Sequence, residues 1–478
     1  MNTNISRREF GKKLAALVSG TALIAQQPSC TSVPKSMPTA QELSNDLKEL
    51  GGTLLTDDVT RQAAAADFGQ VIHRRPIAVL KPRAPDDIVK MAEFANRRGI
   101  KVAMRGQGHA MFGQAQVDGG VVIDSNALNS VRMITFRGAP AIEAGAGALW
   151  GQVVDLAYAA KLTPVVNVDP VYLSVGGTIS TGGFGGTSWR HGFQTDHVLE
   201  LQVVTGEGKL VTCSDERNTE MFNAALGGMG QCGLIVKAVL ELAPAPSHVR
   251  FFVLSYADLE TATADMMTIV KDGRFDHVDG RSRPRQGGGF TYNLEGGVFY
   301  NSPNAPDDPR LLAGLRFASR TDRTMAYVEY YRRQAPLPSA LHPWLYLCLP
   351  ASKYFEYAKR AFDTPAEFAY SSPRFSVWRS NSIKRPLTRM PNEEMVIRFQ
   401  CSRNPPPSAD MPAILAMNRT LYERARDIGG TRLTTSAIPF SQADWIQQYG
   451  PAWKAFSDAK RRFDPNNVLT PGPGIFPS

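Results

Sequence analysis

Cysteine, long apolar runs and clustered charge are all scarce in this chain of 478 residues. The five cysteines are too few for a disulfide-stapled scaffold, and neither they nor the histidines and acidic residues show the spacing of a metal site. Beyond the N-terminal segment no stretch approaches 18 consecutive apolar residues, so we expect no transmembrane helix. The basic residues behind the net charge of +9 are scattered, which argues against nucleic acid as a partner. What remains is an ordinary globular composition over a length that indicates two or three packed units.

Residues 1–34 have the pattern of a twin-arginine export signal. Ser6-Arg7-Arg8-Glu9-Phe10-Gly11-Lys12 is followed by a weakly apolar stretch, residues 14–25, that is too short to span a bilayer. The alternative is a basic first helix of the fold. Because the twin-arginine route exports folded proteins, the signal predicts a cofactor bound before export and a periplasmic or secreted location. A lipid anchor at Cys30 is less favoured, because Gln27-Pro28-Ser29 is a poor lipid-attachment sequence.

After residue 70 the hydrophobic pattern alternates between strand and helix. Residues 77–80 and 100–104 are predicted strands, on either side of a helix that begins at Asp86 and ends at Gly99. Further elements are expected, namely strands at 121–123 and 141–145, a helix over 149–161 and a hairpin over 198–213. From about Pro244 the chain has more arginine, more aromatic residues and longer polar loops. This change predicts an α+β protein in which a second region ends near Ser441 and a turn-rich tail returns to the first.

Three glycine-rich segments stand out. They are Arg105-Gly106-Gln107-Gly108-His109-Ala110, the run from Val175 to Gly186, and Gly227-Gly228-Met229-Gly230-Gln231-Cys232-Gly233. The first lacks the third glycine and the helix of a dinucleotide fingerprint, and the Lys-Ser/Thr of a Walker loop. Glycine lets backbone N–H groups approach a phosphate closely. One such loop alone is more often structural, but three together predict a large cofactor that carries phosphate.

Two side chains near these loops are candidates for chemistry. An imidazole inside a phosphate-binding loop, as at His109, is a plausible attachment point for a cofactor, although most histidines are merely packed or solvated. Asp169 follows the apolar Val165-Val166 and precedes the second glycine segment, so it is a candidate base at the end of a strand. The other interpretation of Asp169 is a helix cap or a solvated loop residue.

These residues resemble those of cytokinin dehydrogenases, which belong to the vanillyl-alcohol-oxidase-type, or PCMH-type, FAD flavoproteins. The resemblance spans most of residues 70–476 and is weakest between about 285 and 335. Its main carriers are the first glycine loop with Gln114, residues 118–123, residues 169–180, Arg190-His191-Gly192, residues 203–208, Gly233-Leu234-Ile235, His342-Pro343-Trp344-Leu345, Leu349-Pro350 and residues 469–476.

The resemblance implies a particular domain organisation. A two-part PCMH-type FAD-binding domain would cover residues 35–244, and an α+β substrate domain with an antiparallel sheet would cover residues 245–441. Residues 442–478 would return to the FAD-binding domain.

The resemblance also implies the roles of individual residues. His109 would carry FAD covalently, and Asp169 would accept the proton of a substrate amine. The second acid of the family, usually Glu, falls on Asp279, which is one methylene shorter. No cysteine lies beside Pro170, so a second covalent bond to the flavin is not expected. The residues expected to line the cofactor are Arg105, Gly106, Gln107, Gly108, Ala110, Gln114, Ser174, Ser180, Phe184 and Ile235.

Three functions remain open from the sequence. The favoured one is a cytokinin dehydrogenase-like oxidation of an N6-substituted adenine, with a small-molecule substrate and with a quinone or O₂ as electron acceptor. The second is oxidation of an alcohol, a sugar or another amine on the same flavin scaffold. The third is an exported protein that binds a flavin or another ligand without redox activity.

Overall fold

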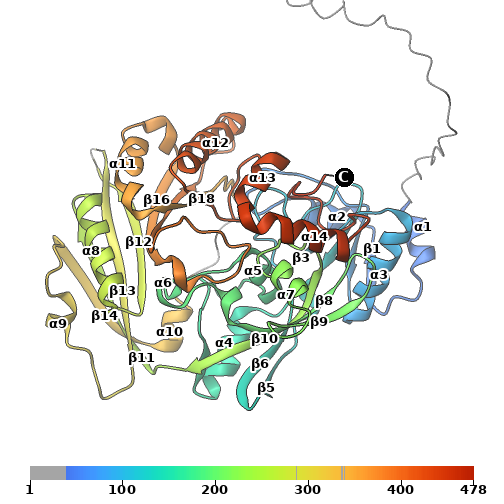
Figure 1. The fold of residues 1–478 in the computed structure, drawn as a ribbon, viewed down its shortest axis with the longest axis horizontal. Coiled ribbons are helices and arrows are strands. Elements are labelled where there is room, and N and C mark those ends of the chain that lie inside the picture. The colour runs from blue at the N-terminus through green and yellow to red at the C-terminus, as the bar shows by residue number, and fades with distance from the viewer. Residues whose placement is uncertain (1–38, 287, 335–336, 338–339, 478) are drawn as a thin grey trace, which may run out of the picture. The chain divides into compact units, whose positions relative to one another are not determined.

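The computed structural model describes residues 39–286, 288–334, 337 and 340–477 (Figure 1). The predicted export signal and Cys30 lie outside these residues. Within them, no helix combines the length and the apolar character that crossing a membrane requires. Cys213, Cys232, Cys348 and Cys401 are buried free thiols.

The N-terminal sheet is small and mostly parallel. Its order is β1-β2-β4-β3, in which only β1 runs antiparallel to its neighbour. Its strands and helices are α1 (Ala40–Asp46), β1 (Thr53–Leu55), α2 (Asp58–Ala65), β2 (Ala78–Lys81), α3 (Pro85–Arg98), β3 (Val102–Arg105) and β4 (Val121–Asp124). The predicted helix end at Gly99 is confirmed by its left-handed φ of 71°, which favours glycine. The predicted start at Asp86 is wrong, because Ala84 is the N-cap and Pro85 fits the first helical position.

The second sheet is antiparallel and has the order β5-β6-β10-β8-β9, with β7 paired to β10. Its strands are β5 (Val131–Phe136), β6 (Ala139–Gly145), β7 (Leu162–Pro164), β8 (Val198–Val204), β9 (Leu210–Cys213) and β10 (Leu234–Pro244). The helices around it are η1 (Ser125–Ala127), α4 (Trp150–Ala159), α5 (Val175–Thr181), α6 (Ser188–His191), η2 (Gln194–His197) and α7 (Thr219–Ala225). The predicted hairpin over 198–213 is confirmed as β8 and β9.

Two details of this region differ from the sequence-based expectation. The segment that begins at Val175 is helix α5 and not a loop. Gly176 lies so close to the preceding sheet that a Cβ atom there would be 2.7 Å from the Cβ of Ala146, so the glycine serves close packing. Val165 and Val166 are not in a strand, because β7 ends at Pro164.

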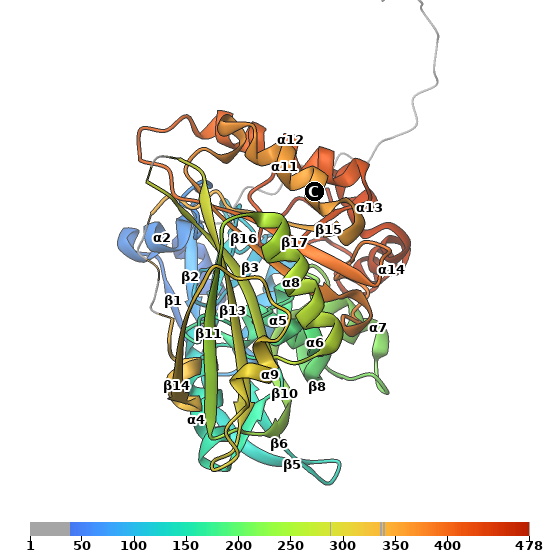
Figure 2. The ribbon, with the colours of Figure 1, turned by 90° about the vertical axis from the view of Figure 1, so that its left-hand side faces the viewer.

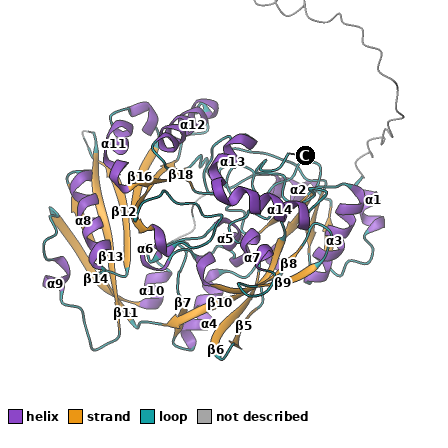
Figure 3. Cartoon of the chain, viewed as in Figure 1, coloured by secondary structure: helices purple, strands orange, loops and turns teal. Residues whose placement is uncertain are grey.

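The third sheet has eight strands and is antiparallel throughout (Figure 3). Its order is β14-β11-β13-β12-β16-β17-β15-β18. The strands are β11 (His248–Tyr256), β12 (His277–Pro284), β13 (Phe290–Tyr300), β14 (Ser319–Ala326), β15 (Leu345–Pro350), β16 (Ser371–Arg379), β17 (Met395–Arg403) and β18 (Thr431–Arg432). The accompanying helices are α8 (Leu259–Asp272), α9 (Asp308–Leu312), α10 (Tyr327–Tyr331), α11 (Ala351–Phe362), η3 (Pro365–Phe368), η4 (Ser380–Ser382) and α12 (Met411–Asp427). The expected antiparallel sheet and the α+β class are therefore confirmed.

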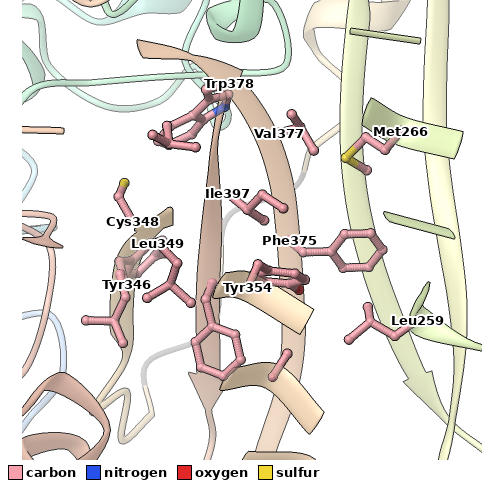
Figure 4. Packing of buried hydrophobic residues seen from close by; sticks show 14 of the residues in the cluster. Leu259, Met266, Tyr346, Cys348, Leu349, Tyr354, Phe375, Val377, Trp378 and Ile397 are labelled. Carbon is pink, nitrogen blue, oxygen red and sulfur yellow. The ribbon is translucent and has the colours of Figure 1, made fainter. Parts of the chain in front are cut away.

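One face of this sheet is apolar and is covered by helices. Helix α8 packs on β13 and β16, and α11 packs on β15 and β17 (Figure 2). Figure 4 shows Phe375 and Val377 of β16 in this core with Leu259 and Met266 of α8. Because side chains alternate along a strand, the residues between these positions point to the opposite face, where the candidate site lies.

The C-terminal segment adds to the N-terminal sheet. After α13 (Gln442–Tyr449), η5 (Gly450–Ala452) and α14 (Trp453–Phe463), Leu469 forms a parallel bridge with Val102 of β3. The buried Asp464 accepts hydrogen bonds from the backbone of Val468 and Leu469, both at 2.9 Å, and fixes the turn before this bridge. Residues far apart in the sequence thus share one sheet.

Candidate active site

One large cavity is lined by residues from all three sheets and their loops. Its wall includes the first glycine loop, the segment from Ser174 to Gly186, the loop before β10, and the face of the eight-stranded sheet opposite its helices. The cavity lies where a cofactor and a substrate could meet, because the glycine loops and the sheet supply different parts of its wall.

The first glycine loop needs its glycines for close backbone approach. A Cβ atom at Gly106 would be 2.0 Å from the Oγ atom of Ser174. Gly108 has a φ of +70°, and a Cβ atom there would meet the guanidinium of Arg105. The loop therefore presents bare backbone to the cavity, as a phosphate-binding loop does.

His109 lines the cavity and is held by aromatic neighbours. Its ring stacks on Phe68, with ring centroids 3.7 Å apart and an angle of 22° between the ring planes. Phe68 in turn stacks on His342 at 4.8 Å. Burial lowers the pKa of His109 to about 4, so the imidazole is neutral near pH 7. Its buried Nε2 atom has no hydrogen-bond partner among the described residues.

Asp169 lies in the loop between β7 and α5 and also lines the cavity. Arg333, which follows α10, donates from Nη2 to Oδ2 of Asp169 at 2.7 Å. The Arg333 side chain is only 10% exposed, and its Cζ atom lies 4.2 Å from the ring centroid of Tyr330. Burial alone would lower the pKa of Arg333, but the Asp169 carboxylate raises it above its usual range, so Arg333 stays charged. Within the described part of the chain, Oδ1 of Asp169 accepts no hydrogen bond, so this oxygen is available to a donor in the cavity.

Asp279 of β12 lies in a cluster of cations on the sheet side of the cavity. Its Oδ1 accepts hydrogen bonds from Ser376 and from Arg398, both at 2.5 Å, and its Oδ2 accepts one from Arg374 at 2.6 Å. Burial favours the neutral acid, but the guanidinium groups of Arg374, Arg398 and Arg281 hold the pKa of Asp279 far below its usual range. Asp279 is therefore a buried carboxylate whose charge is neutralised by arginine.

Almost all of the residues predicted to form the site line this one cavity. Asp169, Asp279, His109 and every residue expected to contact the cofactor except Arg105 are part of its wall. Arg105 donates instead to the carbonyl oxygens of Ala64, at 3.3 Å, and Ala66, at 2.7 Å, at the C-terminus of α2. A cation stabilises the carbonyl end of a helix, so the role of Arg105 here is to anchor the loop.

Several wall residues were missed by the sequence reasoning. They are Tyr346, Arg374, Ser376, Arg398, Gln400, Thr435 and Thr470. Arg333 was missed as well, because it acts from behind the wall and is far from Asp169 in the sequence. The only signal in the sequence was the alternation of polar with apolar residues in Arg374-Phe375-Ser376-Val377 and Arg398-Phe399-Gln400-Cys401.

The wall contains an unusual number of unpaired polar atoms. Buried polar groups in proteins nearly always have hydrogen-bond partners. The buried side-chain atoms of the wall that have none among the described residues are His109 Nε2, Gln114 Oε1, Arg374 Nε, Arg398 Nε, Gln400 Oε1 and Thr435 Oγ1. A bound group with phosphate, ring nitrogens and carbonyl oxygens would supply these partners, so the wall fits FAD together with a polar substrate.

Comparison with known families gives two matches. Residues 76–214 match a family described as "FAD binding domain", and residues 314–476 match one described as "Cytokinin dehydrogenase 1, FAD and cytokinin binding". Both glycine loops that precede β8 lie in the first match, and the arginine-bearing strands β16 and β17 lie in the second.

Curated relatives cover nearly the whole chain. An "Uncharacterized oxidoreductase ORF5 in fasciation locus" from Rhodococcoides fascians is 36% identical, and the alignment covers 88% of this chain and 99% of that protein. "Cytokinin dehydrogenase 4" from Oryza sativa subsp. japonica is 30% identical, with 90% of each chain covered.

Solved structures show the same fold. A 6-hydroxy-D-nicotine oxidase from Arthrobacter nicotinovorans has a TM-score of 0.71 at 20% identity and covers 90% of this chain and 99% of its own. A chitooligosaccharide oxidase has a TM-score of 0.74 at 15% identity and covers 91% and 99%. A VAO-type flavoprotein from Myceliophthora thermophila has a TM-score of 0.70 at 17% identity and covers 93% and 92%. The expected two-part PCMH-type fold is therefore confirmed.

Proposed function

The chain belongs to the cytokinin dehydrogenase family of FAD-dependent oxidoreductases, and from that premise we propose that it oxidises the side-chain secondary amine of an N6-substituted adenine. The observation that carries the proposal is Asp169, a carboxylate in the cavity wall with one oxygen held by Arg333 and the other available to an N–H donor. The alternative is oxidation of an alcohol, a sugar or another amine at the same wall.

The reaction needs a proton acceptor beside the carbon that is oxidised. Bound FAD would supply the acceptor for a hydride from the substrate carbon next to the amine. Asp169 accepts the proton of the amine, which makes the carbon a better hydride donor. Arg333 fixes the orientation of the carboxylate. The C–H and N–H bonds are replaced by a C=N bond, and water then splits this imine into adenine and an aldehyde.

We further propose that His109 attaches FAD covalently and that the glycine loops hold its phosphates. The support for attachment is that His109 is neutral, lines the cavity and has an unpaired ring nitrogen, because a neutral imidazole nitrogen is a nucleophile. The support for phosphate binding is the bare backbone of the first loop. Gln107, Gly108, Ala110, Gln114, Ser174, Ser180, Phe184 and Ile235 complete the proposed cofactor wall.

Anaerobic photometry of the flavin-loaded protein tests the proposed reaction. We expect N6-isopentenyladenine to bleach the oxidised flavin absorbance and to yield adenine. Bleaching by alcohols or sugars, with no response to N6-isopentenyladenine, would support the alternative function. A flavin that none of these compounds bleaches would indicate a protein without redox activity.

Export is proposed from the sequence alone, since Arg7 and Arg8 lie outside the described residues. Replacing both by lysine should leave the precursor in the cytoplasm, because the pathway reads the paired arginines and not the charge. Fractionation of cells measures the distribution. The matched control replaces Lys12 and Lys13 by arginine and should be exported normally. Unchanged periplasmic delivery of the lysine variant would contradict the twin-arginine signal.

A further inference from the structure

Six polar side chains form a continuous patch on the cavity face of the eight-stranded sheet. We call this patch the polar floor, and its members are Asp279, Tyr346, Arg374, Ser376, Arg398 and Gln400. Strand register brings them together, because Gln400 of β17 lies opposite both Arg374 of β16 and Tyr346 of β15, and Arg398 lies opposite Ser376. The polar floor meets the second glycine segment at Phe184, whose ring centroid lies 5.3 Å from the Cζ atom of Arg398.

The carboxylate of the polar floor is already occupied. An ionised Asp offers about four acceptor sites, and Asp279 uses three of them for Ser376, Arg374 and Arg398. The Nε atom of Arg281 lies a further 3.8 Å from Oδ2. A substrate N–H group that approaches Asp279 would therefore meet an acid whose acceptor sites are largely used and which is surrounded by donors.

Donors outnumber acceptors on the polar floor. Arg374 and Arg398 each keep a buried Nε–H group without a partner among the described residues. Both arginines line the cavity, whereas the floor carries one carboxylate. Arg281 lies beside the floor on β12 and does not line the cavity; it pairs with Glu295 at 2.9 Å and does not change this balance. One positive charge of the polar floor is left without a counter-charge, and a buried charge of this kind is unfavourable unless a ligand pairs with it.

We propose that the polar floor binds an oxyanion of the substrate, a carboxylate or a phosphate, so that the preferred substrate carries an anionic group besides the amine that is oxidised. The inference rests on the proposed function for the site of oxidation, and it adds the chemical class of the substrate. Arg374 and Arg398 act as the specificity-determining residues, because the planar guanidinium matches an oxyanion with two parallel hydrogen bonds.

Binding of probes that cannot be oxidised tests this inference. The flavin-loaded protein is titrated with benzoate against the neutral benzamide, and with adenosine 5′-monophosphate against adenosine, and binding is followed by the change in flavin absorbance. We expect at least one anion to bind about tenfold or more tightly than its neutral partner. Preference for benzoate alone indicates a carboxylate, and preference for the nucleotide alone indicates a phosphate. Equal or weaker binding of both anions would overturn the proposal.

The variant Arg374→Gln tests whether the preference for anions comes from the polar floor. Arg374 is 26% exposed, so this variant has a better prospect of folding than one at Arg398, which is 6% exposed. We expect the preference for the anion to fall to about twofold while the Kd of the neutral probe stays unchanged. The matched control is Arg283→Gln, which removes the same charge from an exposed position of β12 and should keep the full preference. An equal loss in both variants, or weaker binding of FAD with an unchanged preference in Arg374→Gln, would overturn the assignment.

These results are distinguishable from failure of the proposed function. Oxidation of N6-isopentenyladenine without any preference for anions would remove this inference and leave the proposed function intact. A clear preference for anions in a protein that oxidises no amine would support this inference and contradict the proposed function. The wild-type titrations need no variant, so the inference is tested even if Arg374→Gln does not fold.

Discussion

Asp169→Asn should slow reduction of the flavin by an amine about 10²–10⁴-fold, because removal of a positioned base typically costs this much. The asparagine side chain keeps the size of Asp169 and part of its hydrogen bonding, but it cannot accept the amine proton. The loss is expected in the reductive step and not in reoxidation. Stopped-flow measurement of flavin reduction at several pH values separates the two steps. A rate within about threefold of wild type would remove Asp169 as the base.

The ion pair between Asp169 and Arg333 affects the stability of the Asp169→Asn variant, and a double variant separates this effect from the effect on the rate. Asp169→Asn leaves the charge of Arg333 buried without its carboxylate, which destabilises a protein by about 3–5 kcal/mol. The double variant Asp169→Asn/Arg333→Gln removes both charges and should recover stability without recovering the rate. Recovery of the rate together with stability would mean that Asp169 is structural.

A second carboxylate provides the matched control. Asp155 of α4 accepts a hydrogen bond from Tyr331 at 2.6 Å and pairs with Arg332, but it is 45% exposed and does not line the cavity. Asp155→Asn should therefore reduce the flavin at a rate within about threefold of wild type. A large loss in this variant would show that rates fall for reasons unrelated to the cavity.

The elements of the fold that the sequence predicted well are those with a strong local pattern. The buried run of β2 and the hairpin of β8 and β9 each combine apolar periodicity with turn residues, and both are present. The prediction of a loop from Val175 is wrong. The glycines of this segment favour a loop, but close packing of Gly176 against Ala146 accompanies helix α5. Tertiary packing of this kind leaves no local signature in the sequence.

The candidate site likewise has one part that the sequence predicted and one part that it did not. Residues of the glycine loops could be identified because they are contiguous, and all three loops contribute residues to the cavity wall. In the first loop every residue except Arg105 lines the cavity. The polar floor as a cluster could not be identified from the sequence, because Asp279, Arg374 and Arg398 are distant in the sequence and meet only through strand register. The resemblance located Asp279 but gave no indication that arginines would neutralise it, since these partners come from two other strands.

Loss of the covalent flavin is the result expected for His109→Ala. Wild-type protein precipitated with acid should keep its yellow colour in the pellet, whereas the variant should release into the supernatant any flavin that it binds. The reason is that the neutral imidazole of His109 is the cavity's candidate nucleophile, with Phe68 stacked on its ring to fix its orientation. Intact-mass measurement should show the added mass of FAD in wild type alone.

His248→Ala is the matched control for this experiment. His248 of β11 stacks on Tyr300 at 5.6 Å and does not line the cavity, so the variant should keep its flavin in the pellet. A wild-type pellet without colour, or an unchanged mass increase in His109→Ala, would contradict attachment through this residue. If the linkage holds, its benefit follows from the proposed export, because a flavin that dissociates outside the cytoplasm cannot be replaced. The attachment at His109 would then keep FAD on a protein that the signal at Arg7 and Arg8 sends out of the cytoplasm.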